Sequence, residues 1–143
     1  MTDTSEISIQ ERSSQEKAVF IGENLAFEVY GKFGTRDPRR IAGILGIKIE
    51  MKDKGSIGEL EVFSSYNHRS KVITIYRDLL MTFSKKVGID NPLDFLLAHE
   101  IFHHLLYKNE VRQRSGILNE ISAHSFAIKL QGSNVIKQGN KDP

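Results

Sequence analysis

Apolar side chains in the first quarter of the chain recur with the period of a helix. From Gln15 onward they are spaced three or four residues apart, and Gly31 and Gly34 follow as stop signals. Residues 1–14 are polar and carry no such stripe, so we expect them to form a flexible N-terminal arm. We expect a helix that starts near Gln15 and buries one stripe, made of Ala18, Ile21, Leu25 and Val29.

A second, shorter helix is expected next. Asp37 is a favourable N-cap, Pro38 is a favourable first helical residue, and Gly46 is a favourable stop. The apolar face between these signals consists of Ile41, Ala42 and Leu45.

The pattern then changes to the two-residue alternation of β-strands. Ile47–Lys52 alternates apolar and polar residues, Glu59–Tyr66 is a second candidate strand, and Lys71–Arg77 is rich in β-branched residues. Turn-forming residues at Asn67–Ser70 join the last two candidates, which should pair as an antiparallel hairpin. The three segments predict a small meander.

Helical spacing returns in the second half of the chain. A short helix should end at Gly88, and a longer one should begin at Asn91 and Pro92, as N-cap and first helical residue. A polar loop, Lys108–Ser115, precedes a last helix that should stop at Gly132.

The order of these elements predicts an α+β fold in one compact domain, residues 15–132, followed by a polar tail, residues 133–143. We expect a small twisted sheet of about three strands with helices packed mainly on one face. The longer helix, which begins at Pro92, should be central because it is strongly apolar.

Composition narrows the possible partners and cofactors. The 143 residues have a formal net charge of only +2, so electrostatics give no reason to expect direct binding to nucleic acid or membrane. The chain has no cysteine, which leaves histidines and carboxylates to hold any metal. The polar N-terminus is unlike a signal peptide and no apolar run is long enough to span a bilayer, so we expect a cytoplasmic protein.

Residues 96–107 read LLAHEIFHHLLY and contain an H-E-x-x-H motif, His99 to His103. Residues four apart share one face of a helix, so His99 and His103 can bind one cation, and Glu100 can act as general base on a water molecule. The alternative is a solvated His/Glu face on an ordinary helix. Burying unpaired histidine and glutamate in so apolar a helix would be costly, which favours a metal.

A catalytic zinc site needs a third protein ligand. The extended motif H-E-x-x-H-x-x-G-x-x-H is absent, because positions 106 and 109 are Leu106 and Asn109. We therefore expect Glu120, on the last helix, to be the third ligand; alternatively it is a surface residue favoured by the helix dipole. His124 lies one turn further on, where it could orient a ligand, replace one, or be a plain surface residue.

Three segments, in this order, resemble the ImmA/IrrE family of metallopeptidase-like proteins. DPRRIAGILGIKI at residues 37–49 is similar to that family's "dp..iA..lGI.v", and LAHEIFH at 97–103 is similar to its "lAHElgH". EISAHSFA at 120–127 is similar to its "E..AN.FA". The chain departs from the family at Phe102, where a small residue is usual and where we expect a narrowed cleft or a displaced strand, and at His124, which replaces the common Asn.

The resemblance implies a zincin-like domain of the gluzincin type. His99, His103 and Glu120 would bind one zinc ion and Glu100 would be the general base. Members of the family resemble site-specific proteases that act on helix-turn-helix repressors of mobile elements or stress genes. We therefore expect a zinc-dependent peptidase with a protein substrate of that kind. Two rivals stay open, namely an inactive metal-binding regulator that binds a transcription factor and an interaction domain without metal.

Overall fold

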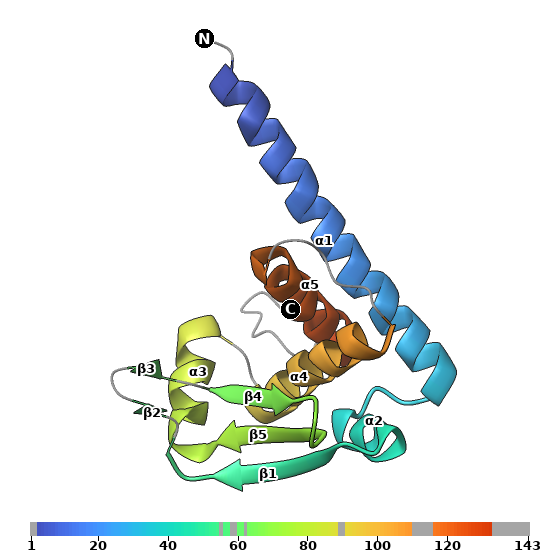
Figure 1. Ribbon diagram of the computed structural model, residues 1–143, viewed down its shortest axis with the longest axis vertical. Coiled ribbons are helices and arrows are strands. Elements are labelled where there is room, and N and C mark those ends of the chain that lie inside the picture. The colour runs from blue at the N-terminus through green and yellow to red at the C-terminus, as the bar shows by residue number, and fades with distance from the viewer. Residues whose placement is uncertain are drawn as a thin grey trace, which may run out of the picture.

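The computed structural model describes residues 3–54, 56–57, 60–61, 63–88, 91–109 and 116–132, which together form an α+β fold (Figure 1). The described helices are α1 (Asp3–Phe33), α2 (Pro38–Leu45), α3 (Leu80–Val87), α4 (Pro92–Asn109) and α5 (Gly116–Gln131), with a 3₁₀ turn (Arg77–Leu79) before α3. The strands are β1 (Lys48–Lys52), β2 (Ser56–Ile57), β3 (Leu60–Glu61), β4 (Ser64–Asn67) and β5 (Val72–Tyr76). The expected polar tail, residues 133–143, lies outside the described residues.

Helix α1 is longer than the sequence predicts. It begins at Asp3 instead of near Gln15, so the expected start of the first helix was wrong and most of residues 1–14, expected to form a flexible arm, belong to this helix. No glycine or proline precedes Gly22, so nothing in the first turns interrupts a helix. The absence of an apolar stripe before Gln15 therefore did not indicate where α1 begins. Of the two predicted stop signals only Gly34 is confirmed, because it follows the helix with a φ of 70°, whereas Gly31 lies within α1.

Helix α1 packs closely against α5. The Ser122 hydroxyl donates a 2.6 Å hydrogen bond to the carbonyl oxygen of Ala18, and both residues are fully buried. Gly22 lies one turn further along α1, where a Cβ atom would overlap the Ser122 carbonyl oxygen and lie 2.9 Å from the Phe126 amide nitrogen. Glycine is therefore required at position 22 for the two backbones to approach.

The second helix forms as its end signals predict. The Asp37 side chain accepts a hydrogen bond from the backbone amide of Arg39, and Pro38 opens the helix. Gly46 closes it with a φ of 75°. The predicted inner face is buried at Ile41 and Ala42, whereas Leu45 is half-buried.

The main sheet has the strand order β1-β5-β4. The predicted hairpin is confirmed, because β4 and β5 pair in antiparallel fashion with Ser64 opposite Ile75. The meander was wrong, because β1 pairs with β5 and the two strands are parallel. Ile73 and Ile75 are fully buried and, being two apart on β5, lie on the same face of the sheet, so the most apolar strand takes the centre of the sheet.

Two other expected boundaries differ from the structure. The candidate strand Glu59–Tyr66 is divided: β3 pairs with β2 in a separate ribbon, and β4 begins only at Ser64. The loop expected at Lys108–Ser115 starts later, because α4 continues to Asn109. Residues 110–115 of that loop lie outside the described residues.

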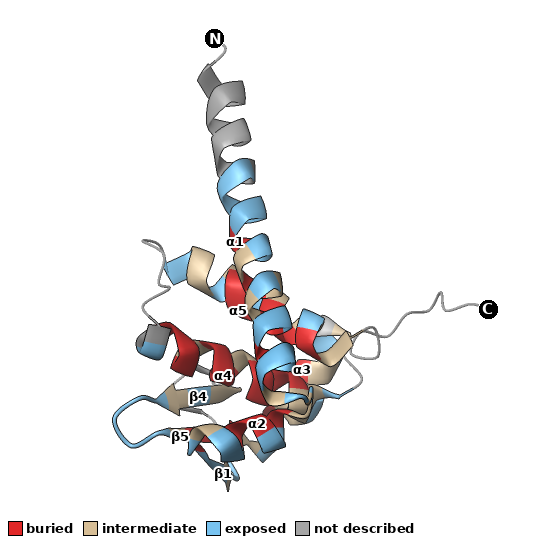
Figure 2. Ribbon diagram, turned by 90° about the vertical axis from the view of Figure 1, so that its right-hand side faces the viewer, coloured by how far each residue is buried: buried red, intermediate tan, exposed pale blue. Residues whose placement is uncertain are grey.

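Helix α4 is the centre of the core. Leu97, Ala98, Ile101 and Phe102 are at most 1% exposed although they point in different directions from the helix axis. Figure 2 shows buried residues along α4 and along the sides of α1 and α5 that pack together. Within the described residues, none of the helices is both long enough and apolar enough to cross a bilayer.

Candidate metal centre

The H-E-x-x-H motif lies on one uninterrupted helix, as predicted. Helix α4 begins at Pro92 and runs continuously through both histidines, with their imidazoles on the side that faces a cleft. The side chains of His99 and His103 are 18% and 21% exposed, so each imidazole is largely buried but still accessible from that cleft.

Glu120 lies opposite both imidazoles. Its Oε1 atom is 3.2 Å from Nε2 of His99, and its Oε2 atom is 3.1 Å from Nε2 of His103. Glu120 is the fifth residue of α5, and the packing of α5 on α4 brings it to the two histidines. The structure therefore brings together the three residues that the sequence predicts as metal ligands.

Glu100 occupies a different position around the same imidazoles. Its Oε2 atom is 3.6 Å from Nδ1 of His99, which is the opposite ring nitrogen from the one that faces Glu120. Donor atoms of His99, Glu100 and His103 lie within 4.8 Å of one another. We nevertheless regard Glu120 as the better third ligand. Glu120 contacts Nε2 of both histidines, whereas Glu100 approaches only Nδ1 of His99.

Glu100 is only 5% exposed and is held by a strand residue. The hydroxyl of Ser64, on β4, donates a 2.6 Å hydrogen bond to Oε2 of Glu100. A buried carboxylate without such a donor would be strongly destabilised, so this contact makes burial of Glu100 possible. Ser64 could not be identified from the sequence, because nothing local to β4 indicates that this strand lies beside α4.

Electrostatics favour a positive charge between the carboxylates. Burial alone would lower the pKa of His99, but the carboxylates of Glu100 and Glu120 outweigh it and raise that pKa to about 9. Hydrogen bonding to His103 and His99 holds the pKa of Glu120 well below its usual range. In the metal-free chain, a proton on His99 supplies the positive charge that a divalent cation would supply.

The donor set fits zinc. Two imidazole nitrogens and a carboxylate oxygen form a common three-residue ligand set of catalytic zinc sites, which keep a further position for water or substrate. The Nδ1 atom of His99 is buried and makes no hydrogen bond to any described residue. This leaves Nε2 as the nitrogen that is aimed at the shared centre.

His124 lines the cleft but does not reach the shared centre in the described contacts. Its ring stands edge-on to Phe95 with the centroids 5.1 Å apart. Burial lowers the pKa of His124, and the nearby charge of His99 lowers it further. These contacts place it beside the candidate ligands, and its expected role in orienting one of them stays a prediction.

The cleft has a volume of about 460 Å³. Its polar side consists of the residues already described, and its apolar side was not anticipated from the sequence: Phe63, Phe83, Phe95 and Leu96. Phe102 does not line this cleft, so the expectation of a narrowed cleft was wrong, while the alternative of a displaced strand stays a prediction. Its ring packs against Phe126 of α5, with centroids 5.5 Å apart, and is fully buried.

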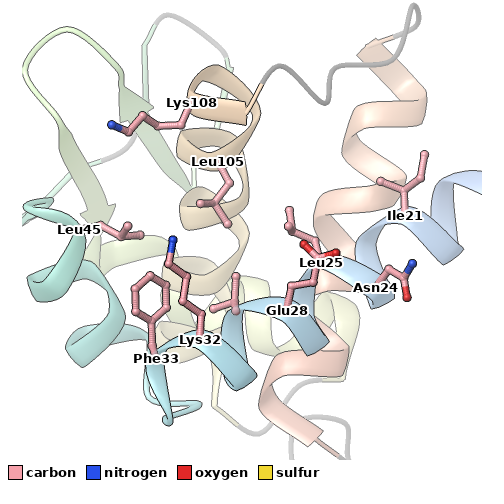
Figure 3. Close-up of a pocket in the computed structure, with 10 residues that line it drawn as sticks. Ile21, Asn24, Leu25, Glu28, Lys32, Phe33, Leu45, Leu105 and Lys108 are labelled. Atoms are coloured by element: carbon pink, nitrogen blue, oxygen red, sulfur yellow. The ribbon is translucent and has the colours of Figure 1, made fainter.

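A second hollow of the same volume lies between α1, α2 and α4 (Figure 3). Its floor is apolar and includes Leu25, Leu45 and Leu105, with Lys32 and Lys108 among the other lining residues. Glu28 is the one carboxylate among the described residues that line it, and no histidine is present there. It therefore offers no set of converging catalytic groups, and the cleft beside α4 and α5 is the better candidate site.

Neither a family model, nor a curated protein, nor a solved structure matches this chain. The assignment of function therefore depends on the geometry of the site and on the motifs themselves.

Proposed function

We propose that this chain is a zinc-dependent peptidase of the H-E-x-x-H type. The observation that carries the proposal is the position of Glu120, whose two oxygens face Nε2 of His99 and Nε2 of His103 at 3.2 and 3.1 Å. A solvated face of an ordinary helix would not need a carboxylate from a second helix at this point. The largely buried Glu100 beside the same imidazoles supports a division between metal ligands and a general base.

The chemistry follows from the roles of the side chains. His99, His103 and Glu120 would hold zinc, which would supply Lewis-acid chemistry to a peptide carbonyl and to a bound water molecule. Glu100 accepts the proton from the attacking water and passes it to the leaving amine when the peptide bond breaks. Its burial at the edge of the cleft keeps bulk water from competing for that proton.

Strand β4 provides a place for an extended substrate. In the described sheet it is an edge strand, with β5 on one side, and Ser64 lines the cleft. An extended peptide can add to such an edge through main-chain hydrogen bonds. The proposed substrate is a specific protein such as a helix-turn-helix repressor, and this part of the proposal is supported by the resemblance of the three motifs to the ImmA/IrrE family.

The test compares cells that express the wild-type chain with cells that express Glu100→Gln, using chemical labelling of new protein N-termini. The full chain is also purified without chelator and analysed for metal. We expect about one zinc per chain in both proteins, and a small number of cleavage sites that appear only with wild type. Bound zinc in both proteins without any wild-type-specific cleavage would contradict peptidase activity and favour the inactive regulator.

A further inference from the structure

Strand β4 is attached to α4 by two polar contacts in register. The Ser64 hydroxyl donates to Glu100, and the Tyr66 hydroxyl shares a 2.6 Å hydrogen bond with Nδ1 of His104. Ser64 and Tyr66 are two apart on a strand, and Glu100 and His104 are four apart on a helix, so each pair lies on one face. Along β4, the half-buried residues Ser64 and Tyr66 alternate with the exposed residues Ser65 and Asn67.

The second contact joins the same strand and helix one helical turn beyond Glu100. His104 is 2% exposed, and the Tyr66 ring stands edge-on to its imidazole with the centroids 5.5 Å apart. His104 thus has a structural partner on β4 and is not among the residues that line the cleft. Tyr66 and His104 therefore hold β4 against α4 at a second point, beside the contact between Ser64 and Glu100.

The first contact acts directly on the proposed general base. Ser64 engages Oε2 of Glu100, the same oxygen that lies 3.6 Å from Nδ1 of His99. Without the hydroxyl, the nearby imidazole nitrogen would be the strongest remaining attraction for that oxygen, and the carboxylate would turn toward His99. With the hydroxyl in place, Oε2 is held by β4, and the described hydrogen bonds and ion pairs of the Glu100 side chain involve Oε2 and not Oε1.

We propose that Ser64 is a positioning residue, which holds the Glu100 carboxylate in the orientation that accepts a proton from the cleft. The role rests on the proposed function, because it presumes that Glu100 is the general base beside a zinc ion. A hydroxyl suits the task, since it donates one short hydrogen bond without adding charge to a site that must bind a cation. The same strand would thus position both the base and an extended substrate.

The experiment uses the full chain as wild type and as Ser64→Ala, Ser64→Thr, Ser65→Ala and Tyr66→Phe. Zinc affinity is measured first, by competition with a chelator. The zinc-loaded proteins are then titrated with acetohydroxamic acid, a zinc-binding probe whose acidic proton needs a neighbouring base. Ser65→Ala removes an exposed hydroxyl from the same strand. Tyr66→Phe removes the hydroxyl that is hydrogen-bonded to His104. Both variants are therefore matched controls.

We expect Ser64→Ala to keep wild-type zinc affinity and to bind acetohydroxamic acid about 10-fold more weakly, the scale of one hydrogen bond to a charged group. Ser64→Thr keeps the hydroxyl and should recover most of the affinity, while Ser65→Ala and Tyr66→Phe should match wild type. Ser64→Cys, which keeps the size but donates weakly, should show the same loss and replaces Ser64→Ala if that variant does not fold.

Equal probe affinity in wild type and Ser64→Ala would overturn the role of Ser64 while zinc binding remained intact. Loss of the same size in Tyr66→Phe would also overturn it, because a general loosening of β4 would then explain both variants. Failure of the wild-type chain to bind zinc would instead overturn the proposed function, and the role of Ser64 with it.

Discussion

His103 on α4 and Glu120 on α5 face each other with Nε2 and Oε2 3.1 Å apart. The contact joins residues from two helices whose packing is secured elsewhere, by Phe102 against Phe126 and by α5 against α1 at Ser122. The site is therefore a product of helix packing, and the proposed metal ligands depend on the core behind them.

Replacing one histidine should remove the metal. His99→Ala deletes a nitrogen that faces Glu120 at 3.2 Å, leaving two ligands where a catalytic zinc site has three. We expect zinc near one equivalent in wild type and near zero in His99→Ala, measured by elemental analysis of protein purified without chelator. His68→Ala, at an exposed turn, is the control. Full zinc occupancy in His99→Ala would show that the ions bind at another place.

The contact of α1 with α5 predicts opposite effects for two glycine substitutions in the same helix. Gly22→Ala forces the helices apart, because its Cβ would overlap the Ser122 carbonyl oxygen, and it should cost about 1–3 kcal/mol of unfolding free energy. Gly31→Ala meets nothing within 4 Å and should stabilise α1 by about 0.5–1 kcal/mol, as alanine usually does in a helix. Urea unfolding measures both. Equal effects of the two substitutions would contradict the close approach.

The metal-free protein should lose stability as the pH rises above neutrality. Folding raises the pKa of His99 from 6.5 to about 9, so its contribution is complete below pH 6.5 and disappears as the pH passes 9. Folding lowers the pKa of Glu120 from 4.5, so its contribution is complete above pH 4.5 and declines in more acidic solution. We expect the melting temperature in chelator to fall between pH 6.5 and 9, and to fall less in Glu120→Gln. A flat profile for wild type would contradict the charge arrangement described above.

The same proton should oppose the metal. Zinc requires neutral imidazole, and His99 holds its proton up to a pKa of about 9 in the metal-free chain. Apparent zinc affinity should therefore increase with pH from 6 toward 9, and calorimetry in buffers of different ionisation enthalpy should detect a released proton. Zinc binding that is independent of pH over this range would indicate that His99 is not a ligand.

Capping residues predicted the ends of α2 and the end of α3 well, because these signals depend only on neighbouring residues. Asp37, Pro38 and Gly46 determine the ends of α2 through contacts within a few positions, and the stop at Gly88 is of the same kind, with a φ of 63°. The continuous helix through His99 and His103 likewise followed from sequence spacing and apolar content.

Contacts between distant segments were harder to predict. The parallel pairing of β1 with β5 depends on which strand is most buried in the folded sheet. The alternation of apolar and polar residues within one strand does not indicate which other strands will pair with it. Ser64 was missed for the same reason, because its partner Glu100 belongs to another element. Gly22 has significance only once α5 lies against it. Glu120 was the exception, because the two histidines of the motif leave a catalytic zinc site one protein ligand short, and the next helix offers a carboxylate.

The central claim is that Glu120 binds the metal while Glu100 moves protons, and zinc titration of two variants tests it most directly. Glu120→Ala removes the carboxylate that faces both Nε2 atoms and should weaken zinc binding about 10-fold or more. Glu100→Gln keeps the shape of its side chain and should bind zinc as wild type does. If Glu120→Ala binds zinc as tightly as wild type, the account is contradicted and the third ligand lies elsewhere, with His124 the first residue to examine.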